Sequence, residues 1–164
     1  MIYQEYVKTN KVAFLEKVKS ISFKLSIDPD WLMVVMYAES RLNEKALNAN
    51  GGASGLIQFM PSTVKPWRVT TEYLRSLSNV EQLDYVYKYF QGYAGKIKSV
   101  FDLYKVTFFP IMLGKASDWI LQSTTLTAAT VANANKIIDL NGDKKITVAE
   151  FEQYVAKYLK KKAV

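Results

Sequence analysis

The chain of 164 residues contains no cysteine and no histidine. It therefore cannot form disulfides, and it cannot use a cysteine nucleophile, a Ser-His-Asp triad or a histidine-ligated zinc ion. The groups that remain for bond cleavage are carboxylates, hydroxyls, lysines and oxygen-ligated metals. The lack of disulfides does not indicate in which cellular compartment the protein acts, because many bacterial and phage proteins have no disulfides in any compartment.

The chain also lacks a long apolar run. Residues 1–19 carry a charge every few positions and contain no apolar core of signal-peptide length. The most apolar stretch, residues 100–113, is interrupted by Asp102, Lys105 and Pro110 and is too short to span a bilayer. We therefore expect no transmembrane segment and a protein made in the cytoplasm without a signal peptide.

The composition that is present indicates a compact globular protein. Hydrophobic residues make up 49% of the chain and aromatic residues 13%, which is enough to build a sizeable core. The formal net charge of +7 favours acidic partners such as nucleic acid, an anionic membrane or a bacterial wall polymer. Because no RRM, zinc-finger or bZIP signature is present, we expect no nucleic-acid partner.

Apolar periodicity predicts a mostly α fold. Residues 12–25 place apolar side chains on one helical face, and Asp28 followed by Pro29 predicts the start of a buried helix that ends near Arg41. A capping box from Ser78 to Glu81 begins another helix. No segment shows the alternation of a strand.

Glu39 stands at the end of the buried helix, after eight residues without charge. The negative end of the helix dipole and the apolar surroundings both disfavour an ionised carboxylate and would raise its pKa. Two interpretations follow from the residues alone: a structural ion pair, with Arg41 for example, or a general acid.

Turn residues from Asn48 to Gly52 follow this helix, and Ser54-Gly55 then leads into the apolar segment 56–60. We expect Gly55 to mark a close approach of two backbone segments.

Glu39-Ser40 and the segment 55–63, Gly-Leu-Ile-Gln-Phe-Met-Pro-Ser-Thr, together resemble the lysozyme-like superfamily, specifically the Slt-type lytic transglycosylases and the goose-type lysozymes. The resemblance covers residues 20–65 closely and extends more weakly to about residue 122. The family's later Ala-Tyr-Asn-x-Gly motif places a tyrosine in the cleft, and Tyr104 is its counterpart here, although the Asn and Gly are absent.

The resemblance implies cleavage of the β-1,4 bond between N-acetylmuramic acid and N-acetylglucosamine in peptidoglycan, with Glu39 as the general acid. A lytic transglycosylase needs no second carboxylate, whereas hydrolysis with inversion would need one. The candidates for a second carboxylate are Glu44, Asp84 and Asp102. The side chains expected to contact sugar or to brace Glu39 are those of Ser40, Ser54 and Gln58, and the cleft tyrosine would be Tyr104.

Residues 139–150 match the twelve-position EF-hand calcium loop. The predicted ligands are Asp139, Asn141, Asp143, the carbonyl of Lys145, Thr147 and Glu150. Residues 127–138 would supply the entering helix. Lys144 occupies the sixth position, where Gly normally makes a sharp turn, so we expect weakened binding and a structural role for Ca²⁺. Because a single loop is present, a sensor role is not favoured.

We therefore predict a lysozyme-like helical domain over residues 1–122, followed by an EF-hand-like helix-loop-helix unit over residues 123–164. The predicted function is cleavage of peptidoglycan glycan strands by a monomer, as a phage or prophage lysin or a secreted effector that reaches the cell wall after release or delivery. Two alternatives remain at this point: a non-catalytic peptidoglycan-binding or virion module, and a calcium-responsive interaction protein.

Overall fold

The computed structural model describes residues 1–159, and it confirms the predicted mostly helical fold. The chain divides into two compact units, Met1–Val100 and Phe101–Val164. The sequence places its domain boundary later, after residue 122, and that boundary stays a prediction. Residues 160–164, at the end of the predicted C-terminal unit, lie outside the described part.

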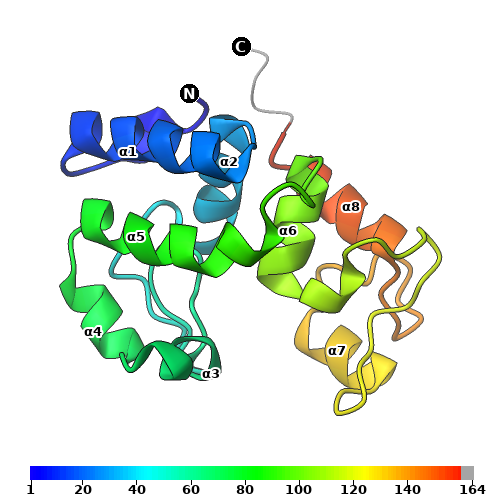
Figure 1. The fold of residues 1–164 in the computed structure, drawn as a ribbon. Coiled ribbons are helices and arrows are strands. Elements are labelled where there is room, and N and C mark those ends of the chain that lie inside the picture. Colours follow the sequence, from blue (N-terminus) through cyan, green and yellow to red (C-terminus); the bar gives the residue numbers. More distant parts are fainter. Residues whose placement is uncertain (160–164) are drawn as a thin grey trace. The chain divides into compact units, whose positions relative to one another are not determined.

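The first unit contains five α-helices (Figure 1). Their bounds are α1 Lys11–Leu25, α2 Pro29–Ser40, α3 Pro61–Val64, α4 Thr71–Ser76 and α5 Asn79–Phe90. Three 3₁₀ turns accompany them, at Gln4–Tyr6, Lys65–Trp67 and Gln91–Tyr93.

Helix α2 lies at the centre of this unit because almost all of its side chains are apolar. Asp28 caps its first turn by accepting a hydrogen bond of 2.8 Å from the Asp30 N–H, and Pro29 takes the first helical position, as predicted. Six consecutive side chains from Leu32 to Tyr37 are buried. Helix α1 packs against α2 and α5. The predicted apolar face of α1 is buried at Phe14, Val18, Ile21 and Leu25.

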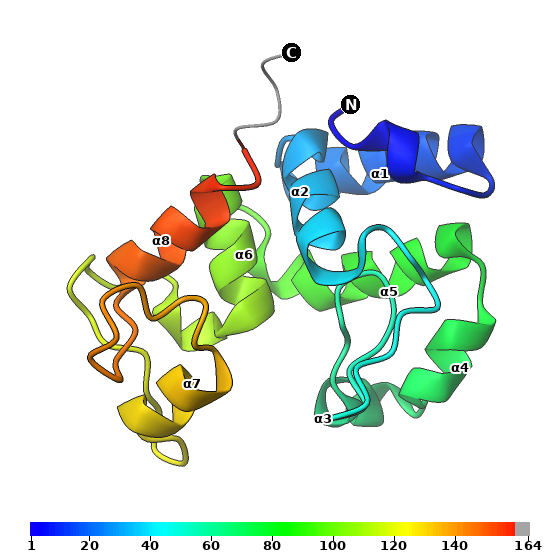
Figure 2. The same ribbon diagram turned by 180° about the vertical axis from the view of Figure 1, so that it is seen from behind.

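The loop between α2 and α3, drawn in cyan in Figure 2, is fastened to α5 by the buried side chain of Gln82. Gln82 Oε1 accepts a hydrogen bond from the Leu56 N–H at 3.0 Å, and its Nε2 donates to the carbonyls of Glu44 at 2.6 Å and Leu74 at 2.7 Å. Gly55 has a φ of +76°, and a Cβ at this position would overlap Gln82 Oε1. The predicted close approach at Gly55 is therefore confirmed.

The second unit contains α6 Val100–Phe108, a 3₁₀ turn at Pro110–Met112, α7 Ala128–Ala134 and α8 Val148–Ala156. Lys105 is buried, and its ammonium group lies 2.6 Å from Glu152 Oε1 on α8 and 3.6 Å from Asp102 Oδ1. This ion pair links α6 to α8.

Helix α7 is shorter than the helix predicted over 127–138. Asn135 leaves the helical conformation, with φ −134° and ψ 46°, and its side chain donates to the Val131 carbonyl at 2.9 Å. An Asn side chain that bonds to the backbone in this way competes with helix continuation.

No helix within residues 1–159 is long and apolar enough to cross a membrane.

Replacing Gly55 by Ala should lower the free energy of unfolding by about 1–3 kcal/mol, because an L-residue at this φ is strained and the new methyl group displaces Gln82. Gly92→Ala is the matched control: its Cβ would meet nothing within 4 Å and its φ is not positive. Urea denaturation followed by circular dichroism measures both variants. If the Gly55 and Gly92 variants were equally stable, this result would contradict the close approach of Gly55 to Gln82.

Candidate active site

Glu39 lies in the last turn of α2 and is half-buried. Tyr37, one half-turn earlier, stacks on Tyr3 with the ring centres 3.8 Å apart. Arg41, which ends the helix in the left-handed conformation, places its guanidinium group 4.5 Å from the centre of the Tyr37 ring. These contacts fix the end of the helix that carries the carboxylate.

Ser40 joins the end of α2 to the following loop. Its hydroxyl is buried and lies within hydrogen-bonding distance of two carbonyl oxygens, Met36 at 3.0 Å and Leu56 at 2.9 Å. The residue next to Glu39 is thereby tied to the backbone of the segment 55–63. Two roles were expected for Ser40, contact with sugar and bracing of Glu39, and this geometry supports the bracing of Glu39.

Ser54 is completely buried and also stabilises the loop between α2 and α3. Its hydroxyl donates to the Gly52 carbonyl at 3.0 Å and accepts a hydrogen bond of 2.6 Å from Arg75 on α4. The backbones of Ser54 and Phe59 exchange two hydrogen bonds, of 3.0 and 2.8 Å, which close the segment into a tight loop.

Gln58 sits at the tip of that closed loop in the left-handed conformation, with φ 53°. Its side-chain Nε2 donates to the Gly55 carbonyl at 3.2 Å, and the side chain is half-exposed. Of the three polar residues expected near Glu39 in this loop region, Gln58 is the most accessible, since Ser40 and Ser54 are buried. Sugar contact by Gln58 stays a prediction.

Tyr89 of α5, which the sequence did not single out, packs against Phe59 of the segment 55–63 with the ring centres 6.5 Å apart. Burial raises the pKa of Tyr89 to about 12, and the Tyr93 phenol and the Glu39 carboxylate add to the increase. The Tyr89 phenol therefore stays protonated at neutral pH and can donate a hydrogen bond.

The other predicted residues have structural contacts of their own. Asp84, a candidate second carboxylate, forms an ion pair of 2.7 Å with Lys17 of α1. In the second unit, Tyr104 is 2% exposed and packs edge-on against Phe151, with the ring centres 5.5 Å apart. Asp102, also in that unit, lies beside Lys105.

The sequence alone did not indicate the roles of Gln82 and Arg75. Their side chains attach the loop between α2 and α3 to α5 and to α4, respectively. A signal for Gln82 was present: it occupies the same helical face as Leu83, Val86 and Phe90, all of which are buried. A glutamine on an apolar face must satisfy its amide internally, so such a position predicts a polar bridge to another backbone segment.

The predicted calcium loop contains oxygen donors suited by type to a hard cation. Asp139 accepts backbone hydrogen bonds from Gly142 at 2.8 Å and Lys144 at 3.0 Å, and Glu150 accepts one from Leu140 at 3.2 Å. Lys144 adopts φ 63°, the turn conformation that Gly normally supplies at this position. Within residues 1–159 no group of three or more carboxylates is gathered closely enough to hold a metal ion.

The backbone of this loop is paired with a segment earlier in the second unit. Leu121 donates to the Ile146 carbonyl at 2.8 Å, and Val148 donates to the Trp119 carbonyl at 3.0 Å. The pairing satisfies backbone groups at the end of the loop.

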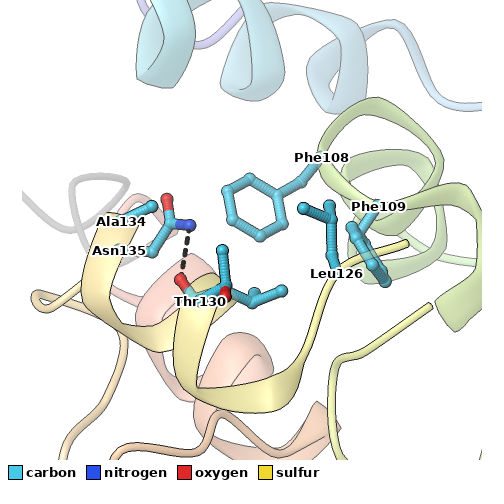
Figure 3. Close-up of a pocket in the computed structure, with 7 residues that line it drawn as sticks. Phe108, Phe109, Leu126, Thr130, Ala134 and Asn135 are labelled. Atoms are coloured by element: carbon cyan, nitrogen blue, oxygen red, sulfur yellow. Dashed lines mark hydrogen bonds between the residues drawn. The ribbon is translucent and has the colours of Figure 1, made fainter. Parts of the chain in front are cut away.

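A pocket of about 180 Å³ lies between α6 and α7 in the second unit (Figure 3). Its lining is mainly apolar and consists of Phe108, Phe109, Leu126, Thr130, Val131, Ala134 and Asn135. None of the residues predicted to act on a substrate belongs to this lining.

Replacing Ser40 by Ala should lower the free energy of unfolding by about 1–2 kcal/mol, because the Leu56 carbonyl loses its side-chain donor. Ser22→Ala is the matched control. The Ser22 hydroxyl is also buried but has no hydrogen-bond partner among the described residues, so its removal should be neutral or stabilising. Thermal and urea unfolding of both variants measure the difference, and a Ser40 variant as stable as the Ser22 variant would contradict the bracing role.

The model of one protein family, the Transglycosylase SLT domain, matches residues 17–105, which is more than half of the chain. The matched region includes Glu39, the segment 55–63 and Tyr104, and it excludes the predicted calcium loop. No curated protein and no solved structure matches the chain. The predicted resemblance to Slt-type enzymes is confirmed at the level of the family: the chain belongs to the transglycosylase SLT domains, a family of enzymes that cleave glycosidic bonds in peptidoglycan.

Proposed function

We propose that Glu39 is the catalytic acid and base of a peptidoglycan lytic transglycosylase. The observation that carries the proposal is the position of this carboxylate: it ends a buried helix, and its neighbour Ser40 is bonded directly to Leu56 in the segment 55–63. The family supplies the substrate class, which is the glycan strand of peptidoglycan.

In the proposed reaction, Glu39 first donates a proton to the glycosidic oxygen as positive charge develops on the muramic acid ring. The 6-hydroxyl of the same sugar then attacks the anomeric carbon while Glu39, now a carboxylate, accepts its proton. The bond to the leaving sugar breaks and a 1,6-anhydro ring forms, so no water is consumed. Glu39 is half-buried and lies in the last turn of α2.

Hydrolysis, as in a muramidase of the goose type, is the alternative outcome. With inversion it would require a second carboxylate roughly 6.5–9.5 Å from the first to activate a water molecule. Asp84, one of the three candidates, forms an ion pair with Lys17. Action at the cell wall as a phage lysin or delivered effector stays a prediction.

Glu39→Gln should lower the rate of lysis of purified peptidoglycan by at least about 10²-fold, because the amide cannot transfer the proton. Turbidity of a suspension of cell-wall sacculi measures the rate, and an unchanged melting temperature shows that the fold is intact. Glu44→Gln and Asp84→Asn are the companion variants and should retain activity. Full activity of the Glu39 variant would refute the proposal, and loss in either companion would indicate hydrolysis with a second carboxylate.

We also propose that the loop 139–150 binds Ca²⁺ as a structural cation of the second unit. The support is its set of oxygen donors, together with the left-handed turn that the loop already makes at Lys144. The neighbouring Lys144 and Lys145 oppose binding by charge, so the affinity should be low. Calcium would stabilise this unit and take no part in the chemistry.

Isothermal titration calorimetry with CaCl₂ should give a dissociation constant of about 10⁻⁴–10⁻³ M for the native chain. Lys144→Gly should bind more tightly, because it removes one positive charge from the loop. Asp139→Ala should not bind. Absence of binding heat in both the native chain and the Lys144 variant would exclude a calcium site.

A further inference from the structure

Four aromatic side chains of the first unit form a row that lies outside its buried core. Tyr73 comes from α4, Trp67 from the 3₁₀ turn after α3, and Tyr85 and Tyr89 from α5. Tyr73 is 46% exposed and the other three are half-buried. We call these four residues the aromatic row.

Three rings of the row follow one another at contact distance, and the fourth is joined to them through Phe59. Tyr73 and Tyr85 have their ring centres 6.5 Å apart, and Tyr85 and Trp67 have theirs 5.9 Å apart. The buried ring of Phe59 connects Trp67, at 6.1 Å, to Tyr89, at 6.5 Å. Phe59, which belongs to the segment 55–63, therefore packs against two rings of the row, Trp67 and Tyr89.

One end of the row reaches the catalytic site. Tyr85 and Tyr89 are four residues apart on α5 and so share one helical face. Tyr89 packs against Phe59 of the segment 55–63, and Leu56 of that segment is bonded to Ser40, the residue next to Glu39. The other end, at Tyr73, is the most exposed of the four rings.

Such a surface suits a sugar chain. Pyranose rings present flat C–H faces that pack on aromatic rings, and tyrosine hydroxyls can bond to sugar hydroxyl and acetamido groups. Lys88 lies over the Trp67 ring at 5.3 Å, and Arg75 bonds to Ser54 beside the row. These cations complement the carboxylates on the peptide stems of peptidoglycan.

We propose that the aromatic row binds the peptidoglycan glycan strand on one side of the bond that Glu39 cleaves, by stacking of N-acetylhexosamine rings on Trp67, Tyr85 and Tyr73. The proposal rests on the proposed function, because it takes the strand to be anchored at Glu39. Tyr89 connects the row to the scissile bond.

The test is binding of soluble glycan fragments that carry stem peptides, measured by calorimetry on the full chain with Glu39→Gln to prevent turnover. Trp67→Ala and Tyr85→Ala, each added to this background, should weaken binding by about tenfold or more. Tyr87→Ala is the matched control: it removes the same type of ring from the same helix, but that ring faces Lys24 of α1 at 5.5 Å. It should change the affinity less than about twofold.

Trp67→Phe and Tyr85→Phe keep a ring and should retain most of the affinity, so they test stacking even if an alanine variant fails to fold. Lys88→Gln should weaken binding of peptide-bearing fragments while leaving binding of stem-free strands unchanged. Unchanged affinity of the folded Trp67 and Tyr85 alanine variants would overturn the proposal.

The two proposals fail in different ways. If the row variants bind normally while Glu39→Gln abolishes lysis, the aromatic row is refuted and the catalytic assignment stands. If the row variants lose binding while Glu39→Gln still lyses peptidoglycan, the row is a glycan-binding surface and the catalytic assignment is wrong.

Discussion

The backbone of Leu56 is the point on which the candidate site depends. Leu56 is completely buried, so both its N–H and its C=O need partners inside the protein. Gln82 of α5 accepts from the N–H, and the Ser40 hydroxyl bonds to the carbonyl. One peptide segment is thereby held from α2 and from α5, and the residue beside Glu39 provides one of the two attachments.

This arrangement explains how a short loop can position the carboxylate of Glu39. Gly55 lets the chain pass Gln82 closely, and the two hydrogen bonds between Ser54 and Phe59 close the loop that follows. Phe59 then supports Trp67 and Tyr89 from the buried side. The contacts that place Glu39 and those that place the proposed sugar-binding rings therefore share the same loop, so a change in Gly55 should affect both.

The sequence predicted those features that depend on local patterns. Asp28 and Pro29 begin α2 because a cap and a fixed φ act within one turn, and Gly55 was identified because few other residues suit its conformation. The role of Gln82 does not follow from a local pattern, because two of its three partners, Leu56 and Glu44, are distant in sequence. The aromatic row was missed for the same reason: helical spacing relates Tyr85 to Tyr89, but only the fold brings Trp67 and Tyr73 beside them.

We propose that a single carboxylate, Glu39, cleaves the glycan strand without water. Mass spectrometry of the muropeptides released from purified peptidoglycan tests this claim most directly, because the two outcomes differ by the mass of one water molecule per cleaved bond. We expect products that end in 1,6-anhydro-N-acetylmuramic acid, and we expect them to disappear with Glu39→Gln. Products with reducing N-acetylmuramic acid ends would contradict this proposal.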